Sequence, residues 1–191
     1  MVIKNILPFS HTLLEEAIQP GDVVIDATAG NGNDTLFLAK RVGKTGKVFA
    51  FDIQNAAIKR TEQRLKDEKA FEQTTLFLCG HERMKQQIPE QYHGKIAAGI
   101  FNLGYLPKGD HSIVTKPEST IEAVNQLFQL LKIGGIIVLV IYPGHPEGKE
   151  EKDRLLPFFQ SIDQNKADVL LYQFLNRKND PPFIVAIEKK K

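Results

Sequence analysis

The sequence predicts an α/β fold, a doubly wound, Rossmann-like sheet of seven strands that is parallel except at its C-terminal end. Short apolar runs alternate with segments of helical spacing, and this alternation predicts parallel strands joined by helical crossovers. The last two apolar runs, Val169 to Leu175 and Phe183 to Ile187, are separated by residues 176–182 alone. Because that link is too short for a helical crossover, these two strands should pair as an antiparallel hairpin.

Capping and turn residues delimit the elements of the first half of the chain. Ser10 can cap a first helix that runs to Ala17 and ends before Pro20-Gly21. Asn33 or Asp34 can cap the second helix, since both side chains accept hydrogen bonds from backbone N–H groups. The other expected elements are the strands Val23 to Ala27, Lys47 to Phe51 and Leu76 to Cys79, and the helices Asp34 to Val42 and Ala56 to Leu65.

Proline and glycine residues mark the expected ends of helices in the second half of the chain. Pro89 stops a short polar helix that begins at His81, and Gly134-Gly135 closes a helix from Thr120 to Leu131. The remaining expected elements before the hairpin are the strands Ile96 to Phe101 and Ile136 to Ile141 and a helix from Lys149 to Ile162.

Length and composition are those of an ordinary globular protein, and we expect one domain over residues 1–191. The chain is 42% apolar and 25% charged, with a net charge of +2 that neither requires nor excludes a nucleic-acid partner. No stretch approaches the roughly 18 to 20 apolar residues of a membrane span, and the N-terminus lacks a signal-peptide pattern. We interpret the single Cys79 as a buried structural thiol of a cytoplasmic protein.

The segment after the first strand carries the clearest functional signal. An apolar run ends at Asp26 and is followed by Gly30 and Gly32, where the absence of a Cβ lets backbone approach a ligand closely. A strand, a glycine turn and a helix N-terminus together suit a nucleotide-type ligand. Thr35 replaces the third glycine of the dinucleotide fingerprint. This motif alone leaves two alternative interpretations open, which are a loop that binds a nicotinamide cofactor and a tight turn that binds no ligand.

Polar residues also follow the next strands, whose carboxyl ends meet at one edge of a parallel sheet. Asp52 lies 20 residues beyond Gly32, a spacing at which an acidic side chain can bind ribose hydroxyls, and Gln54 follows it. Asp52 can equally cap the next helix. His81 and Glu82 would lie near an adenine or at the pocket mouth, with helix capping as the alternative for His81. No second metal ligand occurs at a useful spacing, so we expect no metal.

The missing third glycine and the antiparallel hairpin favour S-adenosylmethionine over a nicotinamide cofactor. A parallel sheet whose last strand enters as a hairpin is typical of class I methyltransferases, whereas nicotinamide-binding domains normally keep all strands parallel. The residues expected to contact S-adenosylmethionine are Asp26, Gly30, Asn31, Gly32, Asn33, Asp34, Thr35, Asp52, Gln54, His81, Glu82 and Asn102.

The end of the fourth strand, Asn102-Leu103-Gly104-Tyr105, is the expected site of chemistry. Many amino methyltransferases carry Asn-Pro-Pro-Tyr or a relative at this strand end. An asparagine oxygen and a neighbouring backbone carbonyl can accept hydrogen bonds from an amine, which aims its lone pair at the methyl carbon. Tyr105 can hold a planar base or shield the sulfonium. The alternative is a loop that uses Asn, Gly and Pro only as turn formers.

These motifs resemble one known family over nearly the whole chain. The resemblance lies in Asp26 to Thr35, Phe51 to Gln54, Gly80 to Glu82, Phe101 to Asp110 and Val114 to Pro117. The family was long labelled putative rRNA methylases, and its members are now assigned as tRNA 5-(aminomethyl)-2-thiouridine methyltransferases of Gram-positive bacteria. The resemblance implies methylation of the aminomethyl nitrogen on tRNA wobble uridine 34, giving 5-methylaminomethyl-2-thiouridine. The chain departs from general methyltransferase patterns at Gly80-His81, where an acidic residue usually contacts adenine.

The mechanism that follows is in-line methyl transfer to a deprotonated amine, with Asn102 and the Leu103 carbonyl positioning that amine. Tyr105 completes the expected active loop, and either Asp110 or His111 accepts the proton, with solvent as the alternative. Methylation of rRNA, or of a small-molecule or protein amine, remains open. An NAD(P)-dependent oxidoreductase is the remoter alternative.

The expected partner is tRNA, and a homodimer is left open. Basic residues suited to phosphate contact are Lys40, Arg41, Lys44 and Lys47 near one edge, Arg177 and Lys178 in the hairpin turn, and Lys108 and Lys116 beside the active loop. Solvated surface charge is the alternative for each. His145, in the loop after the fifth strand, either contacts RNA or forms part of a turn.

Overall fold

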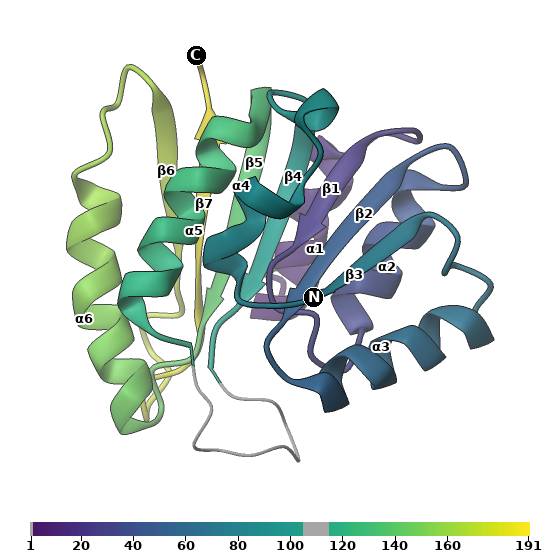
Figure 1. The fold of residues 1–191 in the computed structure, drawn as a ribbon. Coiled ribbons are helices and arrows are strands. Elements are labelled where there is room, and N and C mark those ends of the chain that lie inside the picture. Colours follow the sequence, from purple (N-terminus) through teal and green to yellow (C-terminus); the bar gives the residue numbers. More distant parts are fainter. Residues whose placement is uncertain (1, 105–114) are drawn as a thin grey trace.

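The protein is represented by a computed structural model that describes residues 2–104 and 115–191. In this part of the chain, seven strands form one sheet with the order β3-β2-β1-β4-β5-β7-β6 (Figure 1). The strands are β1 (Val23–Asp26), β2 (Lys47–Asp52), β3 (Thr74–Leu78), β4 (Ile96–Asn102), β5 (Leu131–Ile141), β6 (Ala167–Tyr172) and β7 (Phe183–Lys189). The pairings among β1 to β5 are parallel, and β7 pairs antiparallel with β5 and β6. The predicted fold class is confirmed.

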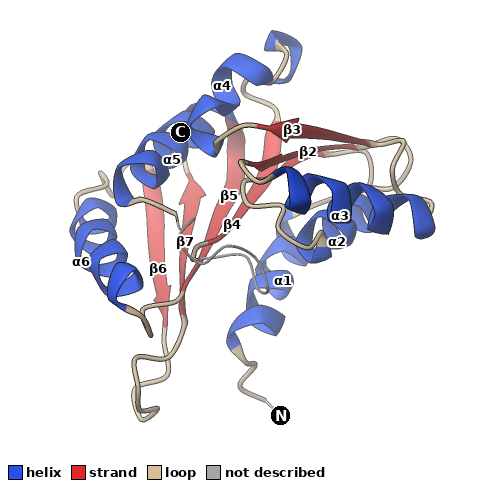
Figure 2. Cartoon of the chain, turned by 60° about the horizontal axis from the view of Figure 1, so that its bottom comes forward, coloured by secondary structure: helices blue, strands red, loops and turns tan. Residues whose placement is uncertain are grey.

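Helices cover both faces of this sheet, with α1, α2 and α3 on one face and α4, α5 and α6 on the other (Figures 1 and 2). Their bounds are α1 (Ile6–Ala17), α2 (Asn33–Val42), α3 (Asn55–Asp67), α4 (Met84–Gln87), α5 (Pro117–Leu130) and α6 (Pro146–Gln160). The 3-10 turns η1 (His81–Arg83) and η2 (Glu90–Tyr92) flank α4. Two layers of helix are what a parallel sheet requires, because both of its faces are apolar.

The alternation of side chains along β5 shows how one strand serves two cores. Ile137 and Leu139 pack in the core that also contains Leu127 of α5. Val138 points into the other core, where it joins Leu14 of α1. Successive side chains of a strand point to opposite faces, so a continuous apolar run buries residues in both layers.

The junction of α5 and β5 differs from the prediction. The helix starts at Pro117 rather than Thr120, and it ends at Leu130 with β5 following directly. Gly134 and Gly135 therefore lie inside the strand and do not close the helix. The β4–β5 register shifts between Ile96 and Ala98, opposite these glycines. Gly134 has φ +74, and glycines at such an irregularity let the strand bend without a side-chain clash.

Two predicted helix caps are wrong. The first helix begins at Ile6, and Ser10 lies inside it with its hydroxyl donating to the Leu7 carbonyl at 2.8 Å. The second helix has Gly32 at its N-cap, so that Asn33 and Asp34 are in its first turn. Asp34 still suits that position, because a carboxylate is favoured near the positive end of a helix. The expected helix from His81 to Ile88 is divided into η1 and α4.

Candidate active site

A cavity of about 1080 Å³ lies where β1, β2, β3, β4 and β5 end. Its walls are the loop after β1, the residues that follow the other four strands, one side of α1, and the turn before β7. This is the edge at which the strand order reverses between β1 and β4, the usual ligand position in an open α/β sheet. The cavity is slightly larger than the usual range of about 300–1,000 Å³ for a small-molecule or cofactor site.

The glycine loop is held from the side of α3. A Cβ on Gly32, which has φ +77, would come within 2.9 Å of the Thr61 Cα atom, so the position accepts only glycine without strain. The Arg64 guanidinium donates to the Asn31 carbonyl at 2.8 Å, and Arg60 donates to the Asn31 side chain at 3.1 Å. These contacts fix the backbone that forms one wall of the cavity.

Asp26 lies beneath the loop and is fully buried. Its carboxylate accepts hydrogen bonds from the Thr35 hydroxyl at 2.5 Å and from the Thr28 N–H at 3.0 Å. Burial, reinforced by the nearby carboxylates of Asp34 and Asp52, raises the pKa of Asp26 to about 7. Asp26 and Thr35, together with Gly32, are not among the residues that line the cavity. Their contacts hold the loop, and the prediction that they touch the cofactor stays a prediction.

Asp52 joins the end of β2 to the glycine loop. Its Oδ2 accepts from the Gly30 N–H at 2.9 Å and its Oδ1 accepts from the Gln54 N–H at 2.8 Å. The N-cap of α3 is Gln54, so Asp52 is not the capping residue that the sequence left as an alternative. Asp52, Gln54, Gly30, Asn31 and Asn33 all line the cavity, as expected of a cofactor-binding wall.

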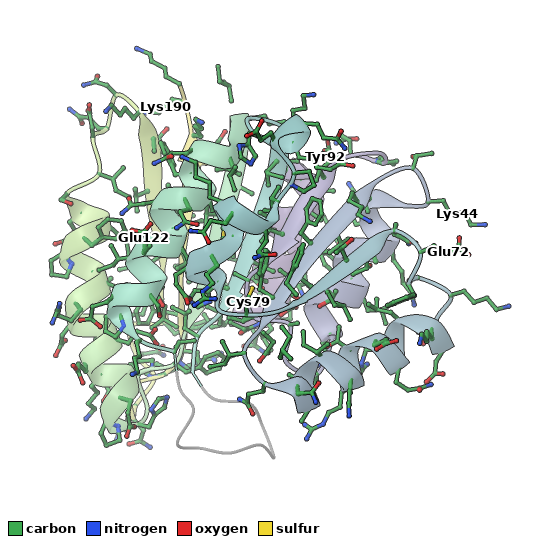
Figure 3. All side chains as sticks on the ribbon, viewed as in Figure 1. Lys44, Glu72, Cys79, Tyr92, Glu122 and Lys190 are labelled. Carbon is green, nitrogen blue, oxygen red and sulfur yellow. The ribbon has the colours of Figure 1, made fainter. Side chains whose placement is uncertain are left out.

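Two residues after β3 differ in burial from what the sequence suggested. His81 is buried, whereas Cys79 is partly exposed. His81 is 8% exposed, its Nδ1 lies 3.1 Å from the Ala27 carbonyl, and burial lowers its pKa. Cys79, expected to be buried, is only half-buried and lines the cavity just beyond β3 (Figure 3). Burial still raises the pKa of the Cys79 thiol. Glu82 lines the same wall. No cluster of three His, Cys, Asp or Glu suited to a metal occurs among the described residues.

Asn102 ends β4 and also lines the cavity. Its backbone N–H donates to the Thr28 hydroxyl at 2.7 Å, and its side-chain Nδ2 donates to Oδ2 of Asp34 at 2.5 Å. The other oxygen of Asp34 lies 2.7 Å from Nε2 of His11, a residue of α1. One carboxylate therefore joins the first helix, the second helix and the fourth strand at the cavity.

The residues that flank the active loop are anchored to α6. The Gly104 N–H donates to the Thr115 hydroxyl at 3.0 Å, and that hydroxyl donates to Glu151 at 3.0 Å. Glu151 is 2% exposed and also accepts from Thr120 at 3.2 Å, while burial raises its pKa. The predicted residues Tyr105, Asp110 and His111, and the basic Lys108, lie outside the described residues.

Several lining residues were missed from the sequence. They are Leu7 and His11 of α1, Thr115, and Asn179 to Pro182 of the hairpin turn. Tyr142 follows β5, and burial together with Asp34 raises its pKa to about 12. The loop after β5 contributes Gly144 and His145, and His145 caps α6 by accepting from the Gly148 N–H at 3.1 Å. His145 is thus part of a turn, which is one of the two roles expected for it.

The basic residues divide between the two ends of the sheet. Lys47 starts β2, so the Lys40 to Lys47 group lies at the end opposite the cavity. In that group Lys40 pairs with Glu68 at 2.7 Å, Arg41 donates to the Ile18 and Glu15 carbonyls, and Lys44 projects from the outer edge (Figure 3). By contrast, Lys116 lines the cavity, and Arg177 and Lys178 adjoin the lining residues of the hairpin turn.

Comparison with known proteins agrees with this geometry. A chloroplastic tRNA (mnm5s2U34)-methyltransferase of Arabidopsis thaliana is 38% identical over 98% of this chain and 70% of its own length. The crystal structure of a putative rRNA-methylase from Clostridium thermocellum superposes with a TM-score of 0.95 at 47% identity, covering 99% of this chain and 100% of the other. A putative methyltransferase from Streptococcus mutans, solved in complex with SAH, gives 0.88 at 39% identity, covering 98% and 99%.

The fold and the polar strand ends define a class I S-adenosylmethionine-dependent methyltransferase. Within that class, residues 48–188 match the family described as "Putative rRNA methylase", and the chain belongs to this family. The oxidoreductase alternative left open by the glycine loop is therefore wrong. No helix among the described residues has the length and apolar character needed to cross a membrane.

Proposed function

We propose that the chain methylates the aminomethyl nitrogen of 5-aminomethyl-2-thiouridine at position 34 of tRNA, using S-adenosylmethionine. In this proposal residues 1–191 act as one domain in the cytoplasm. The name of the Arabidopsis thaliana relative, a tRNA (mnm5s2U34)-methyltransferase, supports the substrate, since the two chains are similar over almost all of this one.

The residues of the glycine-loop wall fit S-adenosylmethionine, which supplies an electrophilic methyl group on a sulfonium when bound. Asp52 uses one hydrogen bond on each carboxylate oxygen, and each oxygen keeps a lone pair for a ribose hydroxyl. Gly30 and Asn31 line the cavity, and Gly30 has no side chain that could keep a ligand from its backbone. His81, neutral because burial lowers its pKa, and Glu82 complete this wall at the expected adenine end.

The acidic lining of the cavity is the observation that carries the amine assignment. Asp34, Asp52, Glu82 and Asp180 line it, whereas Lys116 is the only lysine or arginine among the described lining residues. A cleft lined by one sign of charge attracts ligands of the other sign. Both a sulfonium and a primary ammonium are cations, so this lining suits the two reactants together.

Asn102 then positions the amine in front of the methyl group. Asn102 lines the cavity, its side-chain Oδ1 is buried without a hydrogen-bond partner among the described residues, and Asp34 fixes its amide through the Nδ2 hydrogen bond. The Leu103 carbonyl is the second proposed acceptor. Holding the nitrogen in line with the breaking bond lowers the barrier without any covalent intermediate.

The RNA contacts are proposed for the basic residues at the cavity end of the sheet. Lys116 lines the cavity, and Lys178 adjoins the lining turn 179–182. Arg177 stacks on Phe174, with its guanidinium carbon 3.7 Å from the ring centre. This stacking holds the guanidinium group beside that turn. Phosphate contacts by such residues make affinity strongly dependent on salt.

The decisive experiment is methyl transfer to hypomodified tRNA. Protein, labelled S-adenosylmethionine and tRNA carrying 5-aminomethyl-2-thiouridine are incubated, and nucleosides are analysed by mass spectrometry. Label in 5-methylaminomethyl-2-thiouridine is expected, and tRNA that already carries the methylated nucleoside serves as the control. A parallel incubation with rRNA in place of tRNA tests the rRNA alternative, which label in rRNA but not in tRNA would support.

A further inference from the structure

The side chain of His11 faces the cavity from α1, and its contacts define which of its nitrogens can react. Nε2 lies 2.7 Å from Oδ1 of Asp34, and the ring stacks on Phe37 with the ring centres 4.0 Å apart and an interplanar angle of 10°. The His11 side chain is 33% exposed, whereas that of Asp34 is only 13% exposed. The ring is therefore held in one orientation at the cavity wall.

Asp34 sets the tautomer of this histidine. Its Oδ2 already accepts from the Asn102 amide, and it lies in the first turn of α2. An ionised carboxylate only accepts hydrogen bonds, so Nε2 of His11 carries the hydrogen in this pair and Nδ1 keeps its lone pair. Among the described residues, the His11 side chain makes no further hydrogen bond, and Nδ1 is not among their buried atoms without a partner. An unprotonated imidazole nitrogen is thus available at the wall.

The titratable groups near this pair are acidic. Asp34 faces the ring from α2, and the groups behind Asp34 are Asp26 of β1 and the Tyr142 hydroxyl after β5. A carboxylate on the far side of an imidazole stabilises the imidazolium that forms when the ring takes a proton. In this arrangement His11 is placed as a general base, and the Asp34 carboxylate orients its ring.

We propose that His11 is the proton acceptor for the substrate amine and that Asp34 is the positioning residue that orients both His11 and Asn102. The proposal rests on the proposed function, in which the acceptor is a primary amine. The amine enters as an ammonium ion, and Nδ1 of His11 takes one of its protons. The freed lone pair forms the N–C bond to the methyl carbon while the S–C bond breaks with its electron pair staying on sulfur. The product leaves as a secondary ammonium ion, and His11 returns its proton to solvent.

The central test compares His11→Gln with wild type. A glutamine nitrogen can occupy the place of Nε2 and keep the donation to Asp34, while the titratable nitrogen is lost. We expect kcat on hypomodified tRNA to fall by about 100-fold or more, as for loss of a general base, with KM for tRNA and the calorimetric Kd for S-adenosylmethionine within about twofold. The acid limb of the wild-type kcat profile against pH should be absent from the variant.

His93→Gln is the matched control, because His93 contacts the Ile88 carbonyl before β4 and is not among the cavity-lining residues. It should retain wild-type kcat. A His11→Gln variant with kcat within about twofold of wild type would overturn the proposal. A variant whose loss lies in cofactor affinity would also overturn it, because His11 would then act on the cofactor wall.

Imidazole nitrogen NMR of the protein without substrate separates this proposal from the proposed function. We expect the His11 signals to show hydrogen on Nε2 and none on Nδ1, and the opposite tautomer would overturn the role of His11 whatever the turnover. A wild-type protein that leaves hypomodified tRNA unmethylated would reject the proposed function, and with it the amine step written above. Active wild type with active His11→Gln rejects the role of His11 alone.

Discussion

The N–H of Gly30 donates to Oδ2 of Asp52 across 2.9 Å, which ties the loop after β1 to the end of β2. The other oxygen of Asp52 accepts from Gln54, so the same carboxylate also shapes the turn that enters α3. The glycine loop and the proposed ribose-binding side chain are consequently one rigid unit, and a change in either is expected to be felt by the cofactor.

Replacement Asp52→Asn should weaken S-adenosylmethionine binding. Asparagine can keep one of the two backbone N–H bonds but has a single acceptor oxygen and no charge. Hydrogen bonds to a charged group contribute about 1.5–3 kcal/mol, which corresponds to roughly 10- to 100-fold in Kd. Isothermal titration calorimetry measures the Kd for S-adenosylmethionine. Asp168→Asn removes an exposed partner of Lys190 and should leave Kd unchanged; an unaltered Kd for Asp52→Asn would contradict the ribose assignment.

Gly32→Ala should destabilise the fold. The residue has φ +77, and a Cβ would lie 2.9 Å from the Thr61 Cα atom, so backbone must move. Overpacking of this kind costs about 1–3 kcal/mol in addition to about 1–2 kcal/mol for the left-handed conformation. Gly94→Ala is the control, since Gly94 has φ +75 with nothing within 4 Å of the added atom. Equal unfolding free energies in urea for the two variants would contradict the clash.

Asp26 should make stability fall as pH rises. A carboxyl group whose pKa is higher in the folded protein stabilises it fully below the unfolded pKa, and loses that contribution as pH rises through the folded value. For Asp26 the interval runs from 3.8 to about 7. Asp26→Asn lacks this dependence, so its unfolding free energy relative to wild type should rise between pH 4 and pH 8, as measured by urea denaturation.

Asp163→Asn provides a control of opposite sign for this pH dependence. The backbone N–H of Asn165 lowers the pKa of the exposed Asp163 carboxyl, so its contribution is lost as pH falls. A wild-type protein that gained stability over Asp26→Asn with rising pH would show that Asp26 is not held protonated by burial.

Glu151→Ala should lower both stability and turnover. The change leaves the Thr115 and Thr120 hydroxyls without their buried acceptor, at a cost of about 1–3 kcal/mol. Because Thr115 holds the Gly104 N–H, kcat should fall while the Kd for S-adenosylmethionine stays near the wild-type value. Glu150→Ala, an exposed neighbour on α6, serves as the control in unfolding and kinetic assays. Unchanged kcat in Glu151→Ala would show that this anchor does not reach the active loop.

The sheet could be predicted because its signals are local. Apolar runs give the strands, the short link 176–182 gives the antiparallel pair, and the carboxyl ends of parallel strands meet at one edge. For the same reason Asp52 and Asn102 could be placed at the cavity from the sequence. The prediction that Gly134 and Gly135 end the helix was wrong, because a glycine pair after a helix is a common stop signal. The glycines instead lie at a strand irregularity, which depends on the pairing of β5 with β4.

The rest of the cavity depends on contacts between distant elements. His11 meets Asp34 only because α1 packs across β4, β5 and β7, and no spacing rule links the two residues. Asn179 and Asp180 reach the wall because β7 inserts between β5 and β6, and both adopt positive φ there. The turn itself could be predicted, because Asn-Asp-Pro-Pro is a sequence typical of turns. Its position beside the cavity could not be predicted from the sequence.

The place of β7 between β5 and β6 also governs how the enzyme is assembled during synthesis. The chain leaves the ribosome from its N-terminus, so the loops after β1, β2 and β4 emerge well before residues 179–182, which complete the wall. Until β7 emerges, one edge of β5 lacks its antiparallel partner. The wall of the pocket is therefore completed only when β7 pairs with β5, and we expect cofactor binding to begin at that stage of synthesis.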